Sequence, residues 1–258
     1  MALRRTLINA AVGASIAALA GASVSGCSTS QKSRDEAEMR MQIGTAFLAK
    51  RNYPSALREL KAAEEIDPRN AQVQNNLGLA YFYRDRFDLA EKSLRRALEL
   101  NPKLNEARDN LARVLIEEGH YEDAIRELRL VLADLTYQSP DRAWTNMGLA
   151  YFRRGDFGQA RAKFAEAIEI NRGNCLAHTL YGRSLLEMGE FLSATESLDR
   201  AIQICKDSEF DEPHYFSGLG YLKLGDVGRG LARLEEAVKL FPHGKYAQRA
   251  KSMLQQIR

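Results

Sequence analysis

The sequence contains few of the residues from which catalytic and metal sites are built. Its 258 residues include only three cysteines and four histidines. The histidines are His120, His178, His214 and His243, which are scattered without the spacing of a metal site or a catalytic triad. No glycine-rich loop with phosphate-binding spacing occurs either. We therefore expect no enzymatic activity, no metal, no cofactor and no small-molecule substrate.

The chain also lacks a strong excess of either charge. It has 37 Lys and Arg against 34 Asp and Glu, and residues 1–26 hold two of the arginines and no acid. The remaining residues therefore carry 35 basic and 34 acidic side chains. Proteins that bind nucleic acid rely on a basic surface. This balance predicts that nucleic acid is not a partner.

Long uncharged runs are absent except at the amino terminus. There Arg4 and Arg5 precede an uncharged stretch from Thr6 to Gly26. A basic start followed by an apolar region is typical of a secretory signal peptide, which we place at residues 1–26. A membrane-spanning helix is the alternative. It is disfavoured because Ala, Gly and Ser dominate the stretch and no charged residue follows it directly.

One motif recurs six times along the rest of the chain: a small residue, a large apolar residue three positions later, and a second small residue nine further on. The copies are Gly44-Phe47-Ala56, Gly78-Tyr81-Ala90, Ala112-Leu115-Ala124, Gly148-Tyr151-Ala160, Gly182-Leu185-Ala194 and Gly218-Tyr221-Gly230. The repeats that contain them run over residues 37–70, 71–104, 105–140, 141–174, 175–210 and 211–242. A period of this length indicates an array of repeats.

Each repeat is predicted to be an antiparallel pair of helices. Apolar residues recur at spacings of three and four, which places them on one helix face. Glycines such as Gly119 and Gly155 lie between the two halves, where a positive φ at a helix end suits glycine. The second helices are expected to end before Pro68, Pro102 and Pro242.

The pattern resembles the tetratricopeptide repeat from Ala37 to Pro242. This resemblance implies an all-α, right-handed superhelical solenoid of six repeats. A hairpin cannot bury its apolar face alone, so the last repeat needs a cover. Residues 243–258 are predicted to form that C-terminal capping helix, because Tyr246, Ala250 and Leu254 fall at helical spacing.

The end of the apolar leader predicts a lipid anchor. Val24-Ser25-Gly26-Cys27 resembles the bacterial lipoprotein box, in which the cysteine receives lipid, including palmitate, and becomes the first mature residue. Several acyl chains on one residue give lasting membrane attachment. No Asp follows Cys27, which in lipoproteins of this kind permits sorting to the outer membrane. The alternative is a stray cysteine in an ordinary signal peptide. Residues 27–36 are polar and are predicted to be a flexible tether.

The other two cysteines lie at opposite ends of one repeat. Cys175 occupies position 1 of the fifth repeat and Cys205 its position 31. These positions meet at the same end of an antiparallel hairpin, so a disulfide is possible in an oxidising compartment. Two unlinked thiols are the alternative.

The first helices of a tetratricopeptide array line its concave side, and repeat positions 2, 5, 9, 12 and 13 face that groove. The resemblance thus assigns the partner-binding groove to Met41, Leu48, Asn75, Leu79, Phe82, Tyr83, Leu149, Phe152, Tyr215, Leu219 and Leu222. Asp109, Arg113, Ile116 and Glu117 interrupt it. An apolar groove rimmed with charge suits an amphipathic helix. The alternative is that neighbouring repeats partly cover positions 9 and 12.

A lipid-anchored start, six repeats and a terminal helix together resemble the type IV pilus assembly lipoproteins PilF, PilW and Tgl. Local sequence supports this likeness: Arg34-Asp35-Glu36-Ala37 enters the first repeat, and the segment from Leu135 to Pro140 expands the third. The resemblance implies an outer-membrane lipoprotein that faces the periplasm, is held in the membrane by its lipid, and promotes localisation and multimer assembly of a secretin. An adaptor for cell-wall hydrolases or outer-membrane assembly factors is the alternative.

Overall fold

The computed structural model describes residues 23–206 and 210–257, with only the backbone described for residues 23–30. Within these ranges the chain consists of helices and connecting turns, and no strand occurs. The chain divides into two compact units, residues Met1–Arg69 (unit 1) and Asn70–Arg258 (unit 2). The predicted all-α architecture is therefore confirmed. Within the described ranges, no helix has the length and apolar character that crossing a bilayer requires.

Unit 1 is a single helical hairpin made of α1 (Ser23–Ala49) and α2 (Tyr53–Ile66). Its helices approach closely at Gly44, where an added Cβ would lie 2.7 Å from Cγ of Leu60. Asn52 begins α2 by accepting a hydrogen bond from the backbone N–H of Ser55. The expected small residue and its apolar partner thus form the contact between the two helices.

The structure differs from the expected tether at residues 27–36, because α1 runs through them without interruption. Residues 31–36 are exposed, so packing does not explain the helix. The segment contains no Gly or Pro, and side-chain pairs one turn apart support it. Gln31 donates to Asp35 at 2.8 Å, and Arg40 pairs with Glu36 at 3.2 Å. A helix already formed at residue 37 can therefore extend toward the amino terminus.

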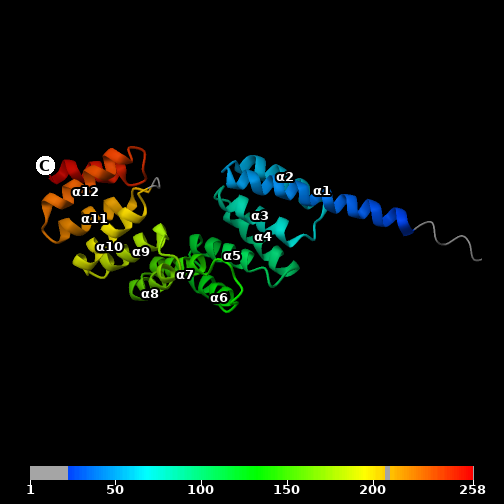
Figure 1. The fold of residues 1–258 in the computed structure, drawn as a ribbon, viewed down its shortest axis with the longest axis horizontal. Coiled ribbons are helices and arrows are strands. Elements are labelled where there is room, and N and C mark those ends of the chain that lie inside the picture. Colours follow the sequence, from blue (N-terminus) through cyan, green and yellow to red (C-terminus); the bar gives the residue numbers. More distant parts are fainter. Residues whose placement is uncertain (1–22, 207–209, 258) are drawn as a thin grey trace, which may run out of the picture. The chain divides into compact units, whose positions relative to one another are not determined.

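Unit 2 consists of five further hairpins and a terminal helix, which Figure 1 shows following one another along the chain. The first helices of the hairpins are α3 (Ala71–Phe82), α5 (Asn105–Glu117), α7 (Pro140–Arg154), α9 (Cys175–Glu187) and α11 (Glu212–Lys223). The second helices are α4 (Phe87–Leu100), α6 (Tyr121–Leu132), α8 (Phe157–Ile170), α10 (Phe191–Ile204) and α12 (Val227–Leu240), and α13 (Ala247–Ile257) ends the chain.

The hairpins end and turn where the sequence indicated. Helices α2, α4 and α12 stop two residues before the prolines, at Ile66, Leu100 and Leu240. The turn glycines Gly119, Gly155, Gly189 and Gly225 all adopt a positive φ, between 78° and 90°. Arg51 and Asp85 take the same left-handed conformation in the first two hairpins, at φ 56° and 55°. These two repeats accept a small backbone strain that glycine would avoid.

The core of unit 2 runs lengthwise through the stack. Each second helix contacts the first helix of the next hairpin, and α13 contacts α12. Leu111, Leu128 and Phe164 are fully buried in the middle of the stack. At its end Tyr246, Ala250 and Leu254 of the terminal segment pack with Leu234. The helix itself begins at Ala247 rather than His243.

Successive first helices also contact one another, from α3 to α5, α7, α9 and α11 in turn. Contacts of that extent between successive second helices are absent in the described part of unit 2. The first helices are therefore closer together than the second helices, and they line the inner side of the stack. We call this surface of unit 2 the inner face.

Candidate functional site

The inner face rests on a buried polar layer that joins consecutive first helices. Asn110 of α5 donates to the side-chain oxygen of Asn75 of α3 at 2.9 Å. One repeat later, Asn146 of α7 donates to Asp109 of α5 at 2.8 Å. Both contacts link position 5 of one repeat to position 6 of the next. A satisfied polar layer of this kind specifies how neighbouring repeats align.

Asp109 is the centre of this layer, with none of its side chain exposed. Arg142 pairs with it at 2.5 Å, and the hydroxyl of Tyr137 donates to it at 3.3 Å. Tyr137 comes from the expanded connection between α6 and α7, so the added residues supply a buried donor. Burial, and then the charge of Asp109, raise the pKa of Tyr137 to about 12. Its hydroxyl therefore keeps its proton at physiological pH.

Two arginines of the first helices stack on aromatic rings. Arg113 of α5 lies over the rings of Phe82 and Tyr83 of the preceding repeat, 4.5 Å and 5.7 Å from their centroids. Such stacking holds a guanidinium in place while its edge stays able to bind. Tyr83 is 43% exposed, so this cluster is accessible from the solvent.

The second arginine, Arg183 of α9, lies between two phenylalanines. It is 4.8 Å from the ring centroid of Phe152 and 4.2 Å from that of Phe216. It also pairs with Glu212 of α11 at 2.5 Å. Its Nε is buried without a hydrogen-bond partner among the described residues, and the two rings supply its surroundings instead. Arg183 thus joins three consecutive repeats.

These two arginines share repeat position 9, which reads Leu79, Arg113, Leu149, Arg183 and Leu219 from the second repeat to the sixth. The sequence reasoning treated Arg113 as an interruption and overlooked Arg183. The alternation of leucine and arginine at this position is visible in the sequence and could have identified both arginines. A charged residue at a half-buried position of every other repeat requires a partner, and the aromatic residue at position 12 of the preceding repeat supplies it in both cases.

Most of the predicted groove residues take part in packing. Asn75 and Tyr215 are buried, and so are Met41 and Leu48 within unit 1. The remaining residues are half-buried except Tyr83: Leu79, Phe82, Leu149, Phe152, Leu219 and Leu222. Phe82, Leu149 and Phe152 pack against the central core, and Leu219 and Leu222 against the terminal one. The inner face is therefore less open and less apolar than the sequence led us to expect.

Position 13 gives the inner face an exposed, charged margin. After Tyr83 it carries Glu117, Arg153, Glu187 and Lys223, all of them exposed. Glu117 and Arg153 of neighbouring repeats form an ion pair at 3.7 Å. Exposed pairs of this kind add little stability. Their charges remain available to a partner.

Cys175 and Cys205 form a disulfide in the structure, with their Cα atoms 5.3 Å apart. Cys175 begins α9 and Cys205 follows α10, so the bond closes the open end of the fifth hairpin. The other expected covalent feature lies outside the described residues. Residues 1–22 of the predicted leader are not described, and neither is the thiol of Cys27.

The chain matches models of the tetratricopeptide repeat over three stretches. The family described as "Tetratricopeptide repeat" matches residues 71–104 and 110–174, and "TPR repeat" matches residues 44–83. The fold is accordingly an all-α solenoid of tetratricopeptide repeats, as predicted.

Solved structures with a similar fold include the proteins PilW and PilF. PilW, described as a widely conserved type IV pilus biogenesis factor, is 20% identical with a TM-score of 0.75, over 82% of this chain and 96% of that one. PilF of Pseudomonas aeruginosa is 21% identical with a TM-score of 0.70, over 87% and 99%. At these identities the likeness shows the fold alone.

Two further similarities are to proteins of the anaphase-promoting complex. A chain of the Cut9–Hcn1 assembly of the anaphase-promoting complex has a TM-score of 0.74 at 16% identity, over 88% of this chain and 44% of that one. Subunit 7 of that complex from Dictyostelium discoideum is 35% identical over 83 residues, which are 31% of this chain and 14% of that protein. This chain therefore matches only a small part of that relative.

Proposed function

We propose that this tetratricopeptide-repeat protein is a type IV pilus assembly lipoprotein that binds a secretin subunit and promotes its localisation and multimer assembly. The cluster of Arg113, Phe82 and Tyr83 on the inner face is the main support for the binding role. It combines a held guanidinium with an exposed aromatic ring, the residue types that dominate binding energies at protein interfaces. The fold shared with PilW and PilF supports the assignment to pilus formation.

The chemistry of the inner face favours an amphipathic segment as the bound part of the partner. Apolar side chains of the segment would contact Tyr83 and the exposed edges of Leu79 and Phe82. An acidic residue of the segment would pair with the guanidinium of Arg113, which forms no ion pair with another residue that the structure describes. This division between apolar and charged contacts is typical of a helix bound in a groove.

The predicted lipid at Cys27 would place the repeats at the periplasmic face of the outer membrane. A lipid anchor confines the binding surface to the neighbourhood of the membrane, which raises the local concentration of any subunit that the repeats hold. A modest affinity then suffices to gather subunits for ring assembly. The repeats need perform no chemistry for this role.

The first test is deletion of the gene, with unboiled membrane fractions separated on a gel and probed for the secretin. We expect the heat-resistant multimers to be lost or displaced to the inner membrane. A Cys27→Ala strain tests the lipid separately, and we expect it to retain the protein but lose outer-membrane multimers. Normal multimers in the deletion strain would contradict the proposal and favour an adaptor for cell-wall hydrolases or outer-membrane assembly factors.

A second test addresses the inner face. Phe82 packs against the core, so we choose Tyr83→Ser with Arg113→Gln, which leaves the core unchanged. The matched control is Leu130→Ser with Arg126→Gln, an exposed apolar residue and an arginine on the second helix α6. We expect the first pair to abolish multimers at unchanged protein level and the control to retain them. Equal multimer levels in both strains would rule out this cluster.

A further inference from the structure

A cavity of about 580 Å³ opens among α8, α9 and α10, away from the inner face. Ile168 of α8, Tyr181 of α9 and Ile204 of α10 give it apolar walls. Its volume falls within the range of sites that hold small ligands or single side chains, about 300–1,000 Å³. None of these residues belongs to the groove predicted from the sequence.

The cavity is larger than its counterpart one repeat earlier, and two residues of the fifth repeat that line it are smaller than those of the fourth. The equivalent space among α6, α7 and α8 measures about 370 Å³ and is lined by Trp144 and Lys163. Lys163 lies over the Trp144 ring, 5.1 Å from its centroid. The fifth repeat has His178 at the position of Trp144 and Ser197 at that of Lys163. The larger pair takes up part of the groove, and the smaller pair leaves more of it open.

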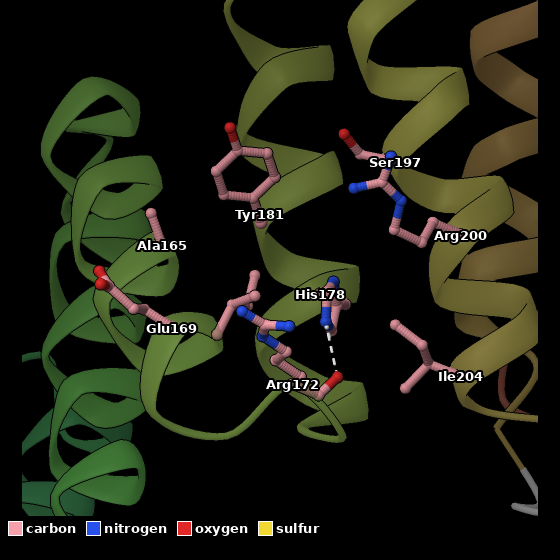
Figure 2. Close-up of a pocket in the computed structure, with 9 residues that line it drawn as sticks. Ala165, Glu169, Arg172, His178, Tyr181, Ser197, Arg200 and Ile204 are labelled. Atoms are coloured by element: carbon pink, nitrogen blue, oxygen red, sulfur yellow. Dashed lines mark hydrogen bonds between the residues drawn. The ribbon is translucent and has the colours of Figure 1, made fainter.

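Two arginines give the cavity a positive charge. Figure 2 shows Arg172, which follows α8, and Arg200 of α10 on opposite sides of His178. Within the part of the chain that the structure describes, neither guanidinium forms an ion pair or a hydrogen bond. Glu169 of α8 also lines the cavity, so its side chains carry two positive charges and one negative charge. Both arginines are exposed, and a guanidinium without a partner can bind a carboxylate through charge-assisted, often bidentate hydrogen bonds.

His178 lines the cavity as a neutral side chain and adds no charge to it. Its Nε2–H donates to the backbone carbonyl of Arg172 at 3.0 Å, which orients the ring at the base of the cavity. Burial, with a smaller effect from the charge of Arg200, lowers the pKa of His178. Its imidazole is therefore neutral at neutral pH, and the two arginines supply the cationic groups.

The disulfide holds two walls of the cavity together. Cys175 lies one turn before His178 on α9, and Cys205 directly follows Ile204 of α10. A bond at this end fixes the spacing of the two helices before anything binds. Such preorganisation lowers the entropic cost of binding.

We propose that this cavity is a second protein-binding site, which takes an acidic residue of a polypeptide together with an adjoining apolar side chain. The carboxylate would lie between Arg172 and Arg200, and the apolar side chain against Ile168, Tyr181 and Ile204. The site lies on different side chains from the inner face, so it allows the repeats to hold two segments at once. It goes beyond the proposed function and does not depend on the identity of the partner.

Two variants and one control test this site. Arg172→Gln with Arg200→Gln removes the charge from exposed side chains and leaves the core intact. His178→Trp introduces the residue that narrows the equivalent groove one repeat earlier. Arg129→Gln is the matched control, because Arg129 lines that narrower groove. Thermal unfolding of each variant verifies that it is folded.

The probe is a phage library of random 12-residue peptides, selected on the intact protein and depleted on the His178→Trp variant. We expect the recovered peptides to carry Asp or Glu beside a large apolar residue. Their synthetic copies should bind the wild type, the Arg129→Gln control and the Tyr83→Ser, Arg113→Gln variant equally. Binding to the Arg172→Gln, Arg200→Gln variant should be weaker by about tenfold or more.

Three outcomes would overturn the proposal. They are the recovery of no peptide, the recovery of peptides without acidic residues, and equal affinity for the wild type and the double arginine variant. Binding to phosphatidylglycerol vesicles through the same arginines, without any acidic peptide, would assign the cavity to lipid headgroups instead. Since the inner-face variant retains the cavity, its result separates this proposal from the proposed function.

Discussion

Replacing Asp109 by Ala should destabilise unit 2 far more than loss of an ordinary surface ion pair. Asp109 is fully buried and accepts hydrogen bonds from Arg142 at 2.5 Å, Asn146 at 2.8 Å and Tyr137 at 3.3 Å. Its loss would leave three donors without their acceptor. Removing one partner of a buried ion pair costs about 3–5 kcal/mol.

How exposed Arg142 and Asn146 are decides where in this range the cost of Asp109→Ala lies. The side chain of Arg142 is 43% exposed, so its guanidinium can regain water once Asp109 is removed. Asn146 is only 6% exposed, and its amide cannot do so without a structural change. A buried unsatisfied donor costs about 1–3 kcal/mol. We therefore expect Asp109→Ala to lower the free energy of unfolding by about 3 kcal/mol, near the lower end of the range for a broken buried ion pair.

Urea unfolding measures this loss, followed by far-ultraviolet circular dichroism and by the fluorescence of Trp144. Trp144 is the single tryptophan of the sequence and lies two residues before Asn146 on α7. The control is Asp123→Ala, which removes an exposed pair with Arg126 on α6 and should cost about 0–1 kcal/mol. If both variants lowered the unfolding midpoint equally, the buried hydrogen bonds of Asp109 would contribute no more to stability than an exposed ion pair does.

Two further predictions concern the fourth and fifth hairpins. Gly148→Ala should destabilise the protein by about 1–3 kcal/mol, because the new Cβ would lie 2.6 Å from the buried ring of Phe164. Gly158→Ala in the same hairpin meets no atom within 4 Å, so it should stabilise the protein by up to about 1 kcal/mol. Thermal unfolding of both variants tests this, and two shifts of the same sign would refute the packing argument. Reduction of the bond between Cys175 and Cys205, which are 30 residues apart, should lower the unfolding free energy by about 3–4 kcal/mol. Urea unfolding with and without dithiothreitol tests this, and an unchanged midpoint in a sample verified to contain free thiols would contradict it.

The repeat architecture could be predicted because it depends on short-range spacing. Gly78 and Leu94 illustrate this: their spacing within one repeat placed them on facing helices, and an added Cβ on Gly78 would lie 2.5 Å from the Leu94 side chain. The helix at residues 27–36 was missed for the opposite reason. Composition there suggested a tether, but pairs such as Gln31 and Asp35 extend a helix that packing has already begun.

The binding surface was harder to predict, because it depends on what neighbouring repeats leave uncovered. Phe82 and Tyr83 are consecutive and looked equivalent in the sequence. In the structure Phe82 packs against Phe87, with ring centroids 5.7 Å apart, whereas Tyr83 is 43% exposed. The exposure of each residue follows from the angle at which its hairpin meets the next, and a one-dimensional pattern does not contain that angle.

The sequence by itself determined the number of repeats, their helical hairpins and the turns between them, because each rests on contacts within about 34 residues of regular spacing. Only the tertiary structure decided the chemistry of the surfaces. It places Arg183 between Phe152 and Phe216 of two other repeats, and it opens a cavity where His178 replaces a tryptophan. Both features arise from differences between repeats that face each other in space, which become visible only when the stack is assembled.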